Sequence, residues 1–447
     1  MLLIPAEVRS WDGAAKAISG IWAADSLRGR FARGAAWSLI GAVFAQGANL
    51  VASMVTARIL GREQYGAYGM VQSTVGMLGV FAGLGLGLTA TKYVAAFRSR
   101  DPERAGRVVA LGCLAAIVSG SLLALALLAY APLLAATTMN APALGDELRI
   151  ASVLLFLNAF NGAQTGALSG FEAFRTIARI NLARGLVTVP ITVAFVLTWR
   201  LPGAVWALTA SAAVTCLLSQ VSLRKHCADL GIHPHLFSAW RERRLLWTFS
   251  TPAFLSGALA GPAFWAANTM LVNQPGGYAE MGVFSAASQW RNAIVFIPSA
   301  LAQFALPLLS NLSGERDLSR YGKALRWNLI FTAVAATAVA VPIALGSQQI
   351  MRLYGEGFQQ GWLVLALSAV TAVISSINSV VGTAILSAGS VWVGFAFNTM
   401  WAVALLVCGQ RLIPTHHALG LAASMFLAYV AHSAWQMVYL RRRLARL

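Results

Sequence analysis

Long apolar runs, separated by short charged segments, dominate this sequence. A membrane-spanning helix needs about 20 mostly apolar residues, and about twelve runs satisfy this. In the first half they cover 34–57, 67–90, 108–130, 150–170, 182–199 and 203–223. In the second half they cover 247–272, 282–309, 327–346, 361–386, 391–409 and 419–440. The strict alternation of membrane β-strands is absent, so the pattern predicts an all-α membrane protein with about twelve spans.

The composition supports this prediction. Hydrophobic residues make up 58% of the 447 residues and charged residues only 11%, against roughly a quarter in soluble domains. A soluble globular domain, a disordered chain and a disulfide-stapled secreted module are therefore excluded. The fifth predicted span is the least regular, because Arg184 lies near one end and Pro190 lies within it.

No metal or cofactor site is readable from the sequence. The four cysteines form no CxxC pair, and three of them lie in apolar runs. Histidine, cysteine and aspartate gather between His226 and His235, but their spacing fits no standard zinc site. We therefore expect no metal and no cofactor, and we interpret this stretch as a solvated loop.

The distribution of basic residues predicts the orientation. The net charge is +18, and 26 of the 33 lysines and arginines fall on one side when the N-terminus is placed there. By the positive-inside rule we expect both termini of this multi-pass protein in the cytoplasm. Membrane lipids are the expected partners of this charge, and no nucleic acid is needed to explain it. Residues 1–33 lack the continuous apolar core of a signal peptide and are expected to be cytoplasmic or interfacial.

The chain contains an internal repeat at an offset of 216 residues. The loop RDPERAGR at 100–107 matches RDLSRYGK at 316–323, and Gly66-Ala67-Tyr68 falls on Gly282-Val283-Phe284 without a gap. Six spans per half give both halves the same orientation, so the expected pseudo-twofold axis runs along the membrane normal. We predict two six-helix lobes, 34–223 and 247–440, joined by a basic cytoplasmic linker at 224–246 and followed by a basic tail at 441–447.

The acidic residues indicate which chemistry is missing. All 15 lie in predicted loops or terminal segments. Ion-coupled antiporters usually keep a carboxylate within the membrane, and glycoside chemistry needs a carboxylate pair. The predicted periplasmic loops are too short for a separate catalytic domain, so we expect no catalytic residues and no enzyme.

Arg291 is the one cation predicted near the middle of a span. It lies nine residues from Gly282, about 13 Å deep in a core about 30 Å thick. An arginine facing lipid there would cost about 3 kcal/mol or more, so we expect it to face a cavity. The alternative is snorkelling, or bonding to backbone carbonyls freed near Pro298.

Amide side chains on several predicted helices suggest a hydrated cavity. Buried amides are costly in lipid, whereas an uncharged wall of amides and hydroxyls suits a sugar. Small hydroxyl residues also hold helices together, so the amides are the better candidates. The four candidates are Gln46, Asn49, Asn161 and Asn378.

Two motifs resemble a known family. The junction TARILGREQYG at 56–66 is similar to the "ARxLGxxxYG" signature of Wzx-type polysaccharide transporters. The stretch from Gly83 to Ala95, GLGLG followed by TKYVA, resembles that family's "GLG…RYVAEY" pattern. These transporters belong to the multidrug/oligosaccharidyl-lipid/polysaccharide exporter superfamily.

The resemblance implies a function and a site. It implies flipping of an undecaprenyl-pyrophosphate-linked oligosaccharide, an O-antigen or exopolysaccharide repeat unit, from the cytoplasmic to the periplasmic leaflet by alternating access. It also implies two lobes around a cationic cavity, for which the candidates besides Arg291 are Lys92 and Arg58. The polymerase and glycosyltransferases of the same pathway are further candidate partners.

Three alternatives stay open at this point. A drug/cation antiporter of the same superfamily is disfavoured by the missing membrane carboxylate. A lipid II flippase typically has fourteen helices, whereas twelve fit this chain. A non-transporting scaffold of a polysaccharide assembly complex gives no reason for Arg291 in mid-membrane.

Overall fold

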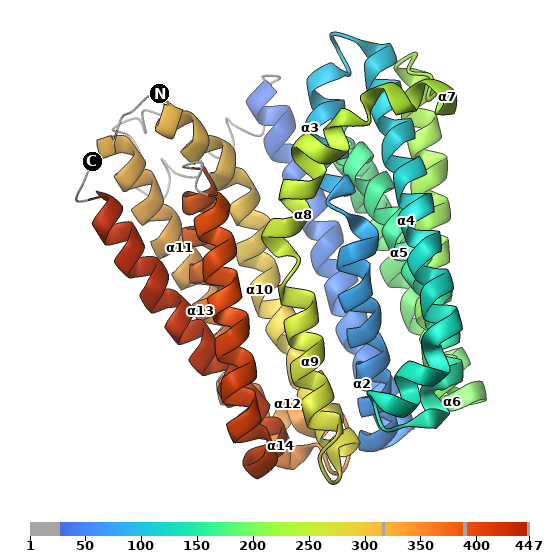
Figure 1. Ribbon diagram of the computed structural model, residues 1–447, viewed down its shortest axis with the longest axis vertical. Coiled ribbons are helices and arrows are strands. Elements are labelled where there is room, and N and C mark those ends of the chain that lie inside the picture. The colour runs from blue at the N-terminus through green and yellow to red at the C-terminus, as the bar shows by residue number, and fades with distance from the viewer. Residues whose placement is uncertain (1–26, 315–317, 388–390, 445–447) are drawn as a thin grey trace.

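The computed structural model describes residues 27–314, 318–387 and 391–444, and these ranges are helical without strands (Figure 1). The first half contains α2 (Leu27–Gly83), α3 (Leu86–Phe97), α4 (Pro102–Thr137), α5 (Gly145–Gly170) and α6 (Phe174–Asp229). The second contains α8 (Thr251–Gly257), α9 (Ala260–Val272), α10 (Gly277–Gly314), α11 (Leu318–Leu345), α12 (Ser347–Leu353), α13 (Trp362–Ser387) and α14 (Val391–Leu444). We call residues 27–229 the N-half and residues 246–444 the C-half.

Three of these helices reverse direction within their length. The backbone leaves the helical region at Gly61 in α2, at Arg200 in α6 and at His417 in α14. When their arms are counted separately, the described residues form twelve long helical segments. Within the described ranges, six helices are long and apolar enough to cross a membrane. The prediction of an all-α membrane protein with about twelve helices is confirmed.

Two of the reversals have the same local structure. Arg200 has φ 50° and ψ −126°, and His417 has φ 47° and ψ −122°, close to the first central residue of a type II′ turn. Three residues later in each case stands a glycine, Gly203 or Gly420. A Cβ on Gly203 would lie 1.9 Å from the Phe195 carbonyl oxygen, so glycine is required there. The corresponding distance from Gly420 to the Leu412 oxygen is 2.1 Å, and each residue of this second turn is 217 positions beyond its counterpart.

The halves meet most closely at one end of the bundle, which we call the closed end. The first residues of α2 and the last of α14 lie at the other end, the terminal end (Figure 1). At the closed end a Cβ on Gly66 would lie 1.8 Å from the backbone carbonyl oxygen of Tyr278, and a Cβ on Gly282 would lie 2.1 Å from that of Arg62. The two contacts are reciprocal, because each residue in one pair is 216 positions from its counterpart in the other.

Polar bonds also join the halves at the closed end. Arg62 Nη2 lies 2.9 Å from Glu280 Oε1 across the halves, and within the C-half the backbone N–H of Ala418 donates to Glu280 Oε2 at 3.3 Å. Arg58 Nε donates to the carbonyl oxygen of Leu353 at 2.6 Å. Buried aromatic residues fill the space beneath them, since the ring of Tyr65 lies 6.0–6.3 Å from those of Phe358 and Tyr354.

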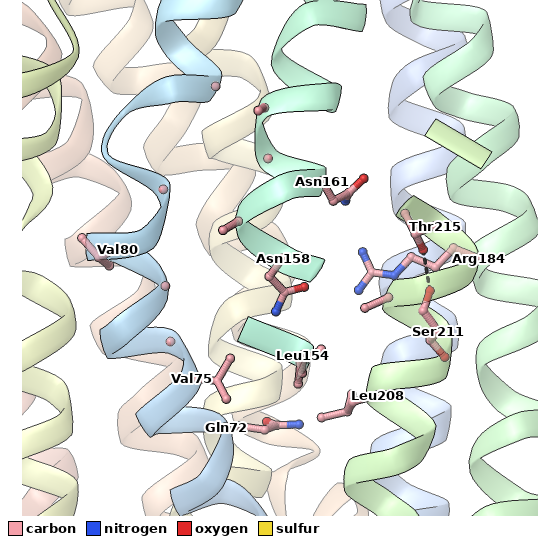
Figure 2. A pocket seen from close by; sticks show the side chains of 18 of the residues that line it. Gln72, Val75, Val80, Leu154, Asn158, Asn161, Arg184, Leu208, Ser211 and Thr215 are labelled. Atoms are coloured by element: carbon pink, nitrogen blue, oxygen red, sulfur yellow. Dashed lines mark hydrogen bonds between the residues drawn. The ribbon is translucent and has the colours of Figure 1, made fainter. Parts of the chain in front are cut away.

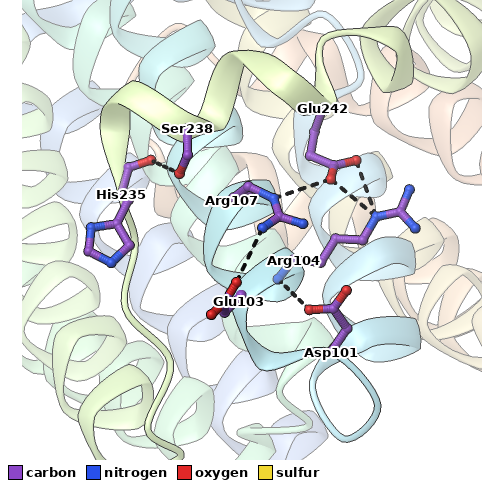
Figure 3. Close-up of polar contacts among 7 residues, drawn as sticks. All are labelled: Asp101, Glu103, Arg104, Arg107, His235, Ser238 and Glu242. Carbon is purple, nitrogen blue, oxygen red and sulfur yellow. Dashed lines mark hydrogen bonds and ion pairs between the residues drawn. The ribbon is translucent and has the colours of Figure 1, made fainter.

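At the terminal end, the connection between the halves packs on the N-half (Figure 3). Its short helices α7 (Leu236–Ala239) and η2 (Trp240–Glu242) bring the buried Glu242 carboxylate to Arg104 Nε at 3.1 Å and Arg107 Nε at 3.4 Å. These arginines belong to the first copy of the repeated octapeptide; the second copy starts outside the described residues. The interpretation of 226–235 as a solvated loop is wrong at its start, because residues 226–229 end α6 and Cys227 is buried.

Candidate functional site

A cavity of about 340 Å³ lies where the two halves meet, and we call it the seam cavity. Side chains of α2, α9, α10 and α14 line it, so both halves contribute. On one wall α9 bonds to α2, because Asn268 Nδ2 donates to Ser73 Oγ at 2.8 Å. The remaining polar lining consists of Gln72, Ser285, Ser288, Gln289, Arg291 and Asn292.

Arg291 supplies the positive charge of the seam cavity. It lies 14 residues into α10, about 21 Å from the start of that helix. Its guanidinium carbon is 5.5 Å from the centre of the Phe264 ring, close enough for a cation–π contact. Its Nε is buried without a hydrogen-bond partner, and no described carboxylate pairs with it. Arg291 thus lines a cavity in the structure, and its part in substrate binding stays a prediction.

A second cavity, of about 590 Å³, lies inside the N-half, and we call it the N-half cavity (Figure 2). The described residues that line it belong to α2, α3, α5 and α6. Its polar wall consists of amides and hydroxyls together with one cation: Asn49, Gln72, Asn158, Asn161, Arg184, Thr188, Ser211 and Thr215. Gln72 and Gly76 of α2 line both cavities, so the two spaces adjoin along that helix.

Arg184 was not among the residues predicted for the site. The predicted fifth span starts at residue 182, so Arg184 falls near its end, where its charge was counted with the basic loop before the span. In the structure α6 begins at Phe174, so Arg184 lies ten residues into the helix. Figure 2 shows its guanidinium pointing from α6 toward Asn158 of α5. Its position at the start of an apolar span was the signal that could have indicated a membrane-embedded arginine.

Both cavities carry the same kind of charge. Each is lined by a single arginine, and neither is lined by a described aspartate or glutamate. A guanidinium in a place with little water favours anions, and its planar fork matches the oxygens of phosphate or carboxylate. The described residues contain no cluster of three potential metal ligands. The arrangement therefore suits the binding of a polar anion.

Of the four amide residues predicted to line a cavity, the structure places two in a cavity wall and two elsewhere. Asn49 and Asn161 line the N-half cavity, where Asn161 Oδ1 accepts a hydrogen bond from Ser219 at 3.0 Å. Gln46 lies on α2 but lines neither cavity. Asn378 lies within the C-half, where its Nδ2 donates to the backbone carbonyl oxygen of Tyr429 at 3.0 Å and its Oδ1 accepts from the Ser433 hydroxyl. The Asn378 amide is thus bonded at both ends and lines neither cavity.

The two other predicted cations lie at opposite ends of the molecule. Lys92 is exposed on α3, toward the terminal end, with its Nζ 4.1 Å from the centre of the Phe249 ring. Arg58 is exposed at the closed end, where it bonds to Leu353. The structure brings neither of them together with Arg291.

The fold defines the class of protein. A solved structure described as "Inward-facing conformation of a multidrug resistance MATE family transporter of the MOP superfamily" superposes with a TM-score of 0.76. The match covers 92% of this chain and 98% of that one at 17% sequence identity. The chain therefore has the fold of transporters of this superfamily.

The sequence defines the family. Residues 31–313 match the family described as "Polysaccharide biosynthesis protein", which is more than half of the chain, and the chain belongs to this family. The EPS I polysaccharide export inner membrane protein EpsE of Ralstonia nicotianae (strain ATCC BAA-1114 / GMI1000) is 25% identical over 389 residues, 85% of this chain and 86% of that protein. The lipid III flippase of Escherichia coli (strain K12) is 25% identical over 411 residues, 90% and 96% of the two chains. The resemblance noted in the sequence is confirmed.

Proposed function

We propose that this protein flips an undecaprenyl-pyrophosphate-linked oligosaccharide, an O-antigen or exopolysaccharide repeat unit, from the cytoplasmic to the periplasmic leaflet. Family membership and the two relatives, a polysaccharide export protein and a lipid III flippase, support a substrate of this kind. Membrane lipids surround the protein, and the polymerase and glycosyltransferases of the same pathway are its proposed partners.

The observation that carries the proposal is the unpaired Arg291 in the seam cavity. A pyrophosphate is a dense anion, and a cavity with one guanidinium and no lining carboxylate attracts it. The same charge repels a cationic drug, so a drug/cation antiporter is the weaker candidate despite the shared fold. A single arginine offers the pyrophosphate one charge-assisted contact, so we expect binding to be moderate and reversible, as transport requires.

The way the halves meet supports a mechanism of alternating access. We propose that they are the two lobes expected from the repeat, 34–223 and 247–440, and that they rock against each other as units. The reciprocal contacts of Gly66 and Gly282 and the equal dihedral angles of Arg200 and His417 support this arrangement. We place both termini in the cytoplasm and the protein in the bacterial inner membrane, so the closed end is expected to be periplasmic and the halves to separate toward the cytoplasm.

The proposal is tested with purified protein in vesicles that contain a radiolabelled polyprenyl-pyrophosphate oligosaccharide. Movement between leaflets is read by the share of glycan that an added glycosidase can cut. Arg291→Ala should slow translocation about 10- to 100-fold, the equivalent of a net loss of about 1–3 kcal/mol from a charge-assisted pair after desolvation. Arg291→Lys should retain part of the activity, because lysine keeps the charge but loses the fork.

The control is Arg411→Ala, which removes an exposed arginine that lines neither cavity. It should translocate like the unaltered protein. Normal activity of Arg291→Ala would refute the pyrophosphate anchor, and loss of activity in proportion to protein abundance would assign Arg291 to assembly. Export of a cationic dye without movement of the lipid-linked glycan would instead establish the antiporter.

A further inference from the structure

The N-half cavity lies inside one half, and its wall carries amides, hydroxyls and an arginine that the lipid part of such a substrate could not use. Its volume of about 590 Å³ falls in the range of small-molecule pockets, about 300–1,000 Å³. The amides and hydroxyls on its wall offer both donors and acceptors, which is what the hydroxyl groups of sugars need. Unlike the seam cavity, it is lined by the N-half alone.

Glycines keep this cavity wide. Five of the lining residues are glycines on α2, α3 and α5: Gly76, Gly79, Gly83, Gly87 and Gly162. A Cβ added to Gly76, Gly83 or Gly162 would meet nothing within 4 Å, so helix packing does not require glycine at these positions. Glycine in a helix interior is unfavourable compared with alanine. The space that the missing side chains leave open is therefore the feature to be explained.

Arg184 gives the cavity its charge. Its guanidinium points into the space (Figure 2), and no described residue forms a hydrogen bond or ion pair with it. Because a charged group inside the membrane is costly, an arginine without a partner points to an anion supplied from outside. The seam cavity already offers Arg291 to one anion, and Arg184 lies in the adjoining space.

We infer that the N-half cavity is a glycan subsite that selects oligosaccharides with an acidic sugar, whose carboxylate pairs with Arg184. This inference rests on the proposed function. The pyrophosphate is tied to the lipid tail and stays in the seam cavity, which is lined from both halves. The glycan extends past Gln72 and Gly76 into the N-half cavity. A guanidinium bonds both oxygens of a carboxylate at once, and a neutral sugar leaves it unpaired.

The test compares two lipid-linked disaccharides that differ only in the terminal sugar, glucose or glucuronic acid. The quantity measured is the ratio of the two translocation rates in vesicles. Arg184→Gln should lower the ratio of acidic to neutral translocation at least about 10-fold, as expected for the loss of a charge-assisted bond. An equal fall in both rates would mean that Arg184 serves the shared pyrophosphate and would overturn the inference. An unchanged ratio with unchanged rates would overturn it as well.

A second readout separates this inference from the proposed function. A soluble disaccharide that ends in glucuronic acid should raise the thermal unfolding temperature of the unaltered protein in detergent, and that of Arg184→Gln less. The disaccharide that ends in glucose should not distinguish the two proteins. If translocation fails for every substrate, the proposed function is wrong. The shift in unfolding temperature still tests the glycan subsite in that case. Equal shifts in both proteins would refute the subsite.

Filling the cavity gives an independent test. Gly162→Leu places a side chain in open space on α5, whereas Gly47→Leu makes the same change on α2 at an equally open position that lines neither cavity. Gly162→Leu should reduce translocation of the acidic disaccharide at least about 10-fold, and Gly47→Leu should leave it unchanged. Normal translocation by Gly162→Leu would show that the glycan does not enter the N-half cavity.

Discussion

The two ends of the molecule are held together in different ways. At the closed end, the polar bonds of Arg62 and Arg58 cross from the N-half to the C-half, and backbone meets backbone at Gly66 and Gly282. At the terminal end, the ion pairs of Glu242 join the connecting segment to α4 of the N-half. The bonds at the closed end must break when the halves separate, whereas the Glu242 ion pairs can stay intact.

The bonds at the closed end therefore affect the balance between open and closed forms, whereas the bonds at the terminal end stabilise the N-half alone. A contact across the halves changes the balance between the open and closed forms, because it exists in one of them. A contact within the N-half stabilises both forms equally and leaves that balance unchanged. Substitutions at the two ends should therefore have different signatures.

The largest effect is expected from Gly66→Val. Its Cβ would overlap the Tyr278 carbonyl oxygen, which is backbone and cannot rotate away. Closure of this end would then be blocked, so translocation should be abolished and the closed form should lose about 1–3 kcal/mol or more from overpacking. Accessibility of a cysteine placed at Tyr65 to a water-soluble thiol reagent should rise.

The control for this substitution is Gly47→Val, at an open position on the same helix. It should leave both translocation and labelling unchanged. If Gly66→Val transports normally, the close approach of the two halves at this end has no part in the cycle.

A smaller effect is expected from Glu280→Gln. The change removes the ion pair with Arg62 and weakens the bond from the Ala418 N–H, while the side chains are 26% and 30% exposed. A pair this exposed contributes about 1 kcal/mol or less, so the closed population should fall up to about fivefold. Distances between spin labels on α2 and α10 would measure it. Glu63→Gln, at a neighbouring exposed carboxylate, should not alter the distances; an equal shift in both variants would mean that only the net charge matters.

The smallest effect on transport is expected from Glu242→Gln. Its carboxylate is 10% exposed and serves two arginines, so the free energy of unfolding should fall by about 1–3 kcal/mol. Translocation per folded molecule should stay within about twofold, because the bonds lie on one side of the moving interface. Thermal unfolding and transport are measured on the same preparation, with Glu103→Gln, whose side chain is 90% exposed, as the control. A large change in the open-to-closed balance would show that the connecting segment takes part in gating.

Hydropathy predicted the helices and the places where the chain turns, but not how sharp the turns are. The reversals at Gly61, Arg200 and His417 fall in the predicted breaks at 58–66, 200–202 and 410–418, and a single residue with positive φ is enough for each. The helical segments are therefore longer than the predicted spans. Because α6 begins at Phe174, eight residues before the predicted fifth span, Arg184 lies well inside the helix rather than near its end.

Site residues could be predicted from the sequence only where the cost of burying a side chain in lipid leaves no alternative to a cavity. Arg291 could be assigned to a cavity because no lipid-facing position tolerates it at that depth. Amides are less constrained: Asn161 lines a cavity, whereas Asn378 is satisfied by Tyr429 and Ser433 on α14. Such partners are brought together by tertiary packing between distant helices, which the sequence pattern does not contain.

Among the described residues, Arg62–Glu280 is the one ion pair that crosses the two halves, and it makes the two edges of the closed end unequal. Counterparts 216 positions away from Arg62 and Glu280 are Tyr278 and Gln64, which cannot form an ion pair with each other, and the Tyr278 hydroxyl instead donates across the halves to the Met139 carbonyl oxygen. An ion pair therefore holds one edge, and a neutral hydrogen bond holds the other. We expect the halves to separate first at the edge of the neutral bond and last at Glu280. Two halves alike in shape would in this way open asymmetrically.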